Sequence, residues 1–156
     1  MLRRRKQPAP VPPPIGGVLI DGSNVIASSD ARPVERIDLA VAWAQSWRPD
    51  LPVSVFLDQS TWNRCRPAAR QELELRAKIC ERGREADVEL LQRAAEQSGL
   101  ILSNDRFWDH EELRSGVITV QFVLRSGELR VYDQATWFPS ARGAAVVVPM
   151  EVLQRG

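Results

Sequence analysis

Short apolar runs alternate with amphipathic segments from Gly16 onward. Three runs that end in turn-forming residues predict buried strands: G-G-V-L-I-D-G-S-N (16–24), L-P-V-S-V-F-L-D (51–58) and L-I-L-S (100–103). Apolar residues at helical spacing predict helices that begin at Pro33, span 67–82 and span 85–98, and F-W-D-H-E-E-L (107–113) predicts a further short one. The runs 117–124 and 128–133 predict a hairpin, and 144–150 predicts a last strand or a segment that docks on the domain.

This order of elements favours an α/β fold. Strands that alternate with helices predict a mainly parallel sheet with helices on both faces, followed here by a C-terminal hairpin. In such sheets ligands bind beyond the carboxyl ends of the strands. The polar residues that follow the predicted strands are therefore the candidates for function.

Length and composition indicate one globular domain. The 156 residues are 44% apolar and 26% charged, and no run approaches the length of a membrane span. The basic N-terminus lacks the apolar segment of a secretory signal. Cys65 and Cys80 stand in no metal-ligand spacing, which favours reduced thiols and a cytoplasmic protein without a zinc site.

The positive charge is concentrated at the N-terminus. Residues 1–14 hold five prolines and four cations and predict an extended, disordered tail, which leaves 15–156 as the folded domain. The net charge is +1, and residues 7–156 alone carry −3. A strong nucleic-acid binder is usually basic, so this body fits such a role only if its acids are gathered for a purpose.

Three predicted strands end at an aspartate: Asp21, Asp58 and Asp105. Each alone is explained as a turn former. Three carboxylates at one edge of a parallel sheet would repel one another unless a cation lay among them.

Asp87 adds a fourth acid, at the edge of the packing face of helix 85–98. On that helix, Glu85, Glu89, Gln92 and Glu96 are expected on the solvated face. A carboxylate beside the core needs a cation, which is either a metal ion or one of the chain's arginines.

Asp109 follows Asp105 by four residues. The two share a face if a helix starts directly after the third strand, although an N-cap with a first-turn acid explains the pair equally well. Carboxylate oxygens without histidine or cysteine ligands favour Mg²⁺ or Mn²⁺ and chemistry at a phosphodiester. His110, the only histidine, is expected at the surface.

Three motifs carry a family resemblance: V-L-I-D-G-S-N-V (18–25), E-A-D-V-E-L-L (85–91) and L-I-L-S-N-D-R-F-W-D (100–109). Together they resemble the PIN-like NYN ribonucleases, and most closely the Regnase-type branch. The resemblance implies a three-layer α/β/α sandwich and an endoribonuclease that cuts single-stranded or looped RNA with metal-activated water. It implies a metal cluster of Asp21, Asp87, Asp105 and Asp109, with Asn24 as its polar support and a phosphate contact.

Two departures from the family pattern concern substrate handling. Ala86 stands where the family often has a second acid beside Asp87, and no strand is predicted between helices 67–82 and 85–98. Further substrate contacts are assigned to Ser103 and Asn104 of the S-N-D motif. Trp62, Arg64 and Arg66 follow the second strand and either stack a base and bind phosphates or form a surface loop with Trp62 partly packed.

Two other functions compete with the nuclease. A PIN-like module without activity would bind RNA or a protein through the same crevice, and Ala86 favours it. A phosphatase with an aspartate nucleophile needs an acid two residues further on, where this chain has Ser23. RNA is the expected partner in the first reading, and the N-terminal tail is a candidate site for a protein partner.

Overall fold

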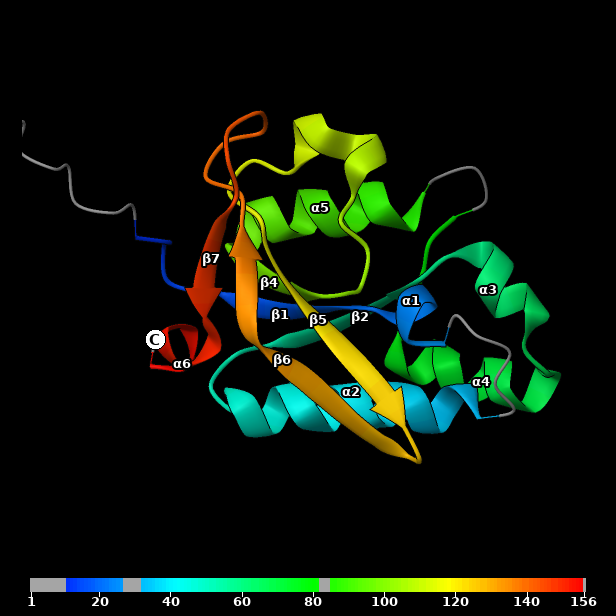
Figure 1. Cartoon of the computed structure of the whole chain (residues 1–156). Helices are drawn as coiled ribbons and strands as arrows, with labels where there is room; N and C mark the ends of the chain where they lie inside the picture. Colours follow the sequence, from blue (N-terminus) through cyan, green and yellow to red (C-terminus); the bar gives the residue numbers. More distant parts are fainter. Residues whose placement is uncertain (1–10, 27–31, 82–84, 156) are drawn as a thin grey trace, which may run out of the picture.

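Seven strands form one sheet in the order β3-β2-β1-β4-β5-β6-β7 (Figure 1). The structure is a computed structural model that describes residues 11–26, 32–81 and 85–155. The strands are β1 (Gly17–Asp21), β2 (Val53–Leu57), β3 (Lys78–Ile79), β4 (Gly99–Leu102), β5 (Ile118–Arg125), β6 (Glu128–Trp137) and β7 (Val146–Pro149). Neighbours from β3 to β5 are parallel, and β6 and β7 pair antiparallel to the strand before them.

Helices cover both faces of this sheet (Figure 1). The helical elements are α1 (Gly22–Ile26), α2 (Pro33–Trp47), α3 (Gln59–Arg64), α4 (Pro67–Arg76), α5 (Ala86–Gln97), the 3₁₀ helix η1 (Trp108–Leu113) and α6 (Met150–Gln154). On one face α5 packs on β1, β2 and β4, with η1 beside it; α2 packs on the other face, against α1 and α4. The predicted three-layer α/β/α class with a C-terminal hairpin is confirmed.

The strands of the sheet centre are apolar on both sides because each face has its own core. Along β1, Leu19 belongs to the cluster under α5, whereas Ile20 belongs to the cluster under α2. Along β4, Ile101 and Leu102 divide in the same way. This alternation explains why the runs are continuously apolar, as expected of parallel strands covered on both faces.

The predicted hairpin forms with a tight turn. β5 and β6 are joined at Ser126 and Gly127, both of which have positive φ angles (51° and 73°). Two such residues match the right-handed twist of the paired strands, and glycine adopts this conformation without strain. The run 144–150 supplies β7 and the first residue of α6.

The segment after α4 corrects one prediction. The helix expected over 67–82 ends at Arg76, and Lys78–Ile79 pairs in parallel with Phe56–Leu57 as β3. A two-residue strand at the sheet edge carries no periodic signal. Cys80 and Glu81, also expected in the helix, form neither helix nor strand, and residue 82 lies outside the described ranges. The predicted tail also lies outside them up to residue 10; residues 11–14 form neither helix nor strand.

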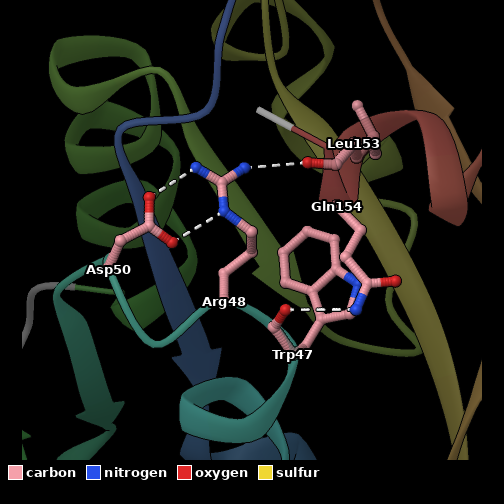
Figure 2. Close-up of polar contacts among 5 residues, drawn as sticks. All are labelled: Trp47, Arg48, Asp50, Leu153 and Gln154. Carbon is pink, nitrogen blue, oxygen red and sulfur yellow. Dashed lines mark hydrogen bonds and ion pairs between the residues drawn. The ribbon is translucent and has the colours of Figure 1, made fainter.

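Hydrogen bonds connect the C-terminal helix α6 to the end of α2 (Figure 2). Buried Arg48 donates two hydrogen bonds of 2.8 Å to the Asp50 carboxylate and one of 2.9 Å to the Leu153 carbonyl. The Gln154 side-chain amide donates to the Trp47 carbonyl at 3.3 Å. One arginine thus pairs an otherwise free carbonyl near the end of α6.

Candidate metal and nucleic-acid site

The alternation of side chains along the strands places several polar residues on the α5 side of the sheet. Leu19, Phe56 and Ile101 pack in the cluster under α5. In an extended strand, side chains two positions apart point to the same side of the sheet. Those positions are held by Asp21, Asp58 and Ser103 at the carboxyl ends of β1, β2 and β4.

The D-G-S-N motif turns sharply from β1 into α1. A Cβ atom on Gly22 would lie 2.7 Å from the Phe56 carbonyl oxygen and 2.9 Å from the Leu57 side chain. Glycine is therefore required for this close approach of α1 to β2. The turn brings the Ser23 hydroxyl to the backbone N–H of Asp58, which donates to it at 2.8 Å.

Asp21 is the buried centre of the site. Asp21 is only 3% exposed. Its Oδ2 accepts a hydrogen bond of 2.7 Å from the Ser103 hydroxyl, and its Oδ1 accepts one of 3.2 Å from the Asn24 N–H. Burial raises the pKa of Asp21 to about 7, helped by the charges of Asp87 and Asp105 and opposed by the two hydrogen bonds. The carboxylate form of Asp21 is held in place and is costly without a cation.

Asp87 faces the same group of acids from the first turn of α5. Burial raises its pKa, and the charge of Asp105 raises it further, while His110 acts in the opposite direction. Among the described residues no arginine forms an ion pair with Asp87, so the alternative of an arginine partner has no support within them. Asp21, Asp87 and Asp105 therefore lie near enough for their charges to repel one another.

Ala86, beside Asp87, points elsewhere. It is 5% exposed and packs in the cluster under α5 with Leu90 and Phe107. Asp87, the acid that this chain retains, is thus the one that interacts with the charges of Asp21 and Asp105. Ala86, where an acid is absent, is part of the core.

The solvated face predicted for α5 is wrong at one position. Glu89 is 5% exposed and forms an ion pair with Lys78 of β3. Helical periodicity alone does not predict the burial of Glu89, because the strand β3 that carries its partner Lys78 was not predicted. Glu85, also expected to face water, is exposed but pairs with His110 Nε2 at 2.5 Å.

Asp105 and Asp109 do not share one helical face as expected. The chain after β4 stays irregular, and Asp105 forms a local turn in which its Oδ1 accepts from the Phe107 N–H at 2.8 Å. Phe107 then adopts a left-handed conformation (φ 54°), and η1 starts only at Trp108. Asp109 is exposed on η1, and its charge is not among those that shift the pKa of Asp21 or Asp87.

Asp58 caps a helix that the sequence did not reveal. Its Oδ1 accepts from the Thr61 N–H at 2.6 Å and from the Ser60 hydroxyl at 2.8 Å, at the start of α3. Burial acts to raise the pKa of Asp58, but these hydrogen bonds and the one with Ser23 outweigh it and lower the pKa overall. The turn-former interpretation of this acid therefore describes its contacts well.

The three motif side chains that were predicted to contact substrate, Asn24, Ser103 and Asn104, form hydrogen bonds within the protein. Ser103 is fully buried, and its hydroxyl also accepts from the Asp105 N–H at 3.0 Å. The Asn24 side-chain oxygen accepts from the Asn104 N–H at 2.8 Å, and the Asn104 side-chain oxygen accepts from the Phe122 N–H at 2.9 Å. These bonds give all three side chains a supporting role within the site.

The residues predicted to follow β2 lie on and just after α3. Trp62 is half-buried against the core under α2, with the Arg70 guanidinium 5.0 Å from its ring centre. Arg64 and Arg66 are exposed. Trp62 is thus partly packed, as the alternative interpretation expected, but Trp62 and Arg64 belong to a helix and not to the surface loop of that interpretation.

The donor set fits a hard divalent cation. Mg²⁺ binds through one or two carboxylates and keeps several waters, so it needs no complete cage of protein ligands. Asp21, with its raised pKa and two orienting hydrogen bonds, and the nearby Asp87 and Asp105 supply oxygen ligands only. Within the described ranges, however, no three acidic, histidine or cysteine side chains are already gathered at ligand distance.

Across the parts of the chain that the structure describes, no helix is long and apolar enough to span a membrane. No family profile matches the sequence, and no curated protein matches it.

Solved structures of a plant protein share this fold. Two structures of nuclear protein-only RNase P 2 from Arabidopsis thaliana superpose with TM-scores of 0.54 and 0.56, at 18% and 15% sequence identity. In both cases the match covers 80% of this chain and 30% of the plant chain. The likeness shows that this chain shares its α/β/α fold with a part of that protein.

Proposed function

We propose that this chain is a metal-dependent endoribonuclease that cuts single-stranded or looped RNA. The observation that carries the proposal is the buried carboxylate of Asp21, held by Ser103 and Asn24 and faced by Asp87 and Asp105. Such a group is costly without a cation and is suited to one. Its place at the carboxyl ends of β1 and β4 is where ligands of α/β sheets bind.

Each side chain has a defined task in this proposal. Asp21 and Asp105 would hold the ion, Asp87 would orient the attacking water, and Ser103 links Asp21 to the backbone of Asp105 through its one hydroxyl. A bound Mg²⁺ or Mn²⁺ supplies an activated water and offsets charge at the phosphodiester. Asp109, which the structure leaves exposed on η1, remains the fourth candidate.

The proposed reaction is hydrolysis. A water oxygen forms a bond to phosphorus while the bond from phosphorus to the ribose 3′ oxygen breaks, and that oxygen takes up a proton. The products are a 5′-phosphate and a 3′-hydroxyl. The 2′-hydroxyl takes no part, so no cyclic phosphate forms.

RNA is proposed as the substrate from the fold and from the motifs. The chain is similar to a part of a plant RNase P protein, and its motifs resemble the Regnase-type NYN ribonucleases. Arg64 and Arg66 offer exposed cations next to β2, and Arg3, Arg4, Arg5 and Lys6 offer four more. We propose that these cations bind phosphates and so compensate for the acidic body.

The test is cleavage of an end-labelled single-stranded RNA with Mn²⁺, Mg²⁺ or EDTA. Wild type should cut internally in either metal and not in EDTA, and its products should carry 5′-phosphates. Asp21→Asn should lose nearly all activity. Cutting that survives EDTA, or products with 2′,3′-cyclic phosphates, would contradict the proposal.

One observation favours a second candidate, a PIN-like module that binds RNA without cutting it. Ala86 stands at a position where related ribonucleases often have an acid, and here it is built into the core. The same assay separates the two candidates, because a binding module shows metal-independent affinity for RNA and no cleavage.

A further inference from the structure

The loop after β4 presents a tryptophan that the sequence motifs did not single out. Trp108 is 67% exposed, although the residue before it, Phe107, is only 1% exposed and packs under α5. Phe107 has a left-handed backbone (φ 54°), which is uncommon for a bulky residue. The chain thus accepts a strained conformation that buries one aromatic ring and turns the next one outward.

An arginine covers one face of this tryptophan. The Arg114 guanidinium lies 4.8 Å from the Trp108 ring centre and 4.6 Å from that of Phe138. Arg114 is 4% exposed, and its Nη1 donates to the Arg106 carbonyl at 3.3 Å. Arg114 is therefore fixed between two rings, and it holds the indole with its other face toward solvent.

The tryptophan lies close to the acidic site. Only Arg106 and Phe107 separate it from Asp105, so the Cα atoms of Asp105 and Trp108 are at most about 11 Å apart. The same short helix carries His110, which pairs with Glu85 at the N-terminus of α5, two residues before Asp87. Arg106, two positions before Trp108, is exposed and provides a cation in the same segment.

We propose that Trp108 is a stacking platform for one base of single-stranded RNA next to the scissile phosphate. The inference rests on the proposed nuclease function and adds a base subsite to it. A flat ring of fixed orientation, with one open face and a neighbouring cation, is the arrangement by which proteins hold unpaired bases without reading their sequence. Arg114 is a positioning residue, because it acts only through Trp108.

The test combines protein variants with RNAs that each lack a single base. Binding of a short labelled single-stranded RNA is measured by anisotropy in EDTA, where no cleavage occurs, and kcat/KM is measured in Mn²⁺. For wild type, one abasic position should weaken binding by about 5- to 150-fold, the effect of losing one stacked base. Trp108→Leu should weaken binding of intact RNA similarly and should make that abasic position neutral.

Two further variants complete the design. Trp108→Tyr should restore most of the affinity, because tyrosine also stacks. Tyr132→Leu, which removes a half-exposed aromatic residue of β6, should leave both measurements unchanged. Thermal melts in EDTA should agree between the Trp108 variants, which shows that each is folded.

The outcomes separate the subsite from the nuclease. Suppose that wild type cuts RNA, but the loss of affinity caused by Trp108→Leu and the loss caused by the abasic position simply add. The base subsite is then overturned, and the nuclease proposal stands. If wild type binds RNA with the expected coupling but does not cut it, the nuclease fails and the base subsite stands. Equal binding of intact RNA by Trp108→Leu and wild type also overturns the subsite, and would leave Trp108 as a contact for another protein.

Discussion

The Ser103 hydroxyl donates a 2.7 Å hydrogen bond to the Asp21 carboxylate, across 82 positions of sequence. The same oxygen accepts from the Asp105 N–H at 3.0 Å. One buried hydroxyl thus links the ends of two neighbouring parallel strands and fixes two candidate metal ligands relative to each other.

Ser103→Ala should destabilise the metal-free protein in a pH-dependent manner. The Ser103 hydrogen bond acts to lower the pKa of Asp21, so its loss should raise that pKa above about 7. At pH 8 the ionised Asp21 then lacks its partner, and the free energy of unfolding should fall by about 1–3 kcal/mol. At pH 5, where Asp21 is protonated, the loss should be smaller.

Urea denaturation in EDTA at both pH values measures this effect. Ser115→Ala, at an exposed serine, is the matched control and should change little. An equal loss for Ser103→Ala at the two pH values would mean that the hydroxyl serves packing and not the charge of Asp21.

Arg48→Met should loosen the C-terminal helix. Methionine keeps the apolar stem but removes the donor to the buried Leu153 carbonyl (Figure 2), which should cost about 1–3 kcal/mol in unfolding free energy. Asp50→Asn should cost less than Arg48→Met, because the Asp50 side chain is 63% exposed and its ion pair is screened by water. Urea denaturation compares the two variants; a larger loss for Asp50→Asn would show that the ion pair, and not the carbonyl, holds α6.

Much of this fold follows from local patterns in the sequence. The runs around Leu19 and Ile101 are apolar on both sheet faces, so they are recognisable as parallel strands without any alternation. The tight turn at Ser126 and Gly127 joins two runs of strand-forming residues. The features that the sequence did not reveal are either very short or depend on tertiary contacts. Strand β3 has only two residues, and the buried Glu89 depends on its ion pair with Lys78 of that strand.

The part of the candidate site that lies at the strand ends was predictable from the sequence. The side-chain alternation that places Leu19 under α5 places Asp21 there as well, and this follows from period alone. The relation of Asp105 to Asp109 was not predictable, because it depends on the left-handed Phe107, which no local rule assigns to phenylalanine. Trp108 was missed for the same reason: its orientation is set by that turn and by Arg114.

Deleting residues 1–10 should weaken RNA binding without changing the fold. Among the described residues the first one buried in the core is Ile15, and we expect the melting temperature to stay within about 1–2 °C of wild type. The deletion removes four cations, and the slope of log Kd against log salt should fall by up to about three for single-stranded RNA. Anisotropy titrations over a range of salt measure the slope; an unchanged slope would point to a protein partner for the tail.

The raised pKa of Asp21 gives a signed pH dependence for the metal-free protein. The pKa is 3.8 in the unfolded chain and about 7 in the folded one, so the folded state binds more protons between these values. Stability that depends on this group is present below about pH 4 and is lost as pH rises through about 7. In EDTA, the unfolding free energy of Asp21→Asn relative to wild type should therefore increase from pH 4 to pH 8, by up to about 4 kcal/mol.

Metal should offset much of that difference. A cation that binds only the folded state stabilises it by about 2.7 kcal/mol at a hundred times Kd, and its binding requires the carboxylate form. At pH 8 in Mn²⁺, wild type should gain this stability, while Asp21→Asn and Asp105→Asn should gain little. Glu96→Gln, at an exposed acid of α5, should respond to Mn²⁺ as wild type does; Glu85 is unsuitable as the control because it pairs with His110. If Mn²⁺ does not shift the wild-type melt and Asp21→Asn gains no relative stability at pH 8 in EDTA, these aspartates are caps and turn formers, and the nuclease proposal fails.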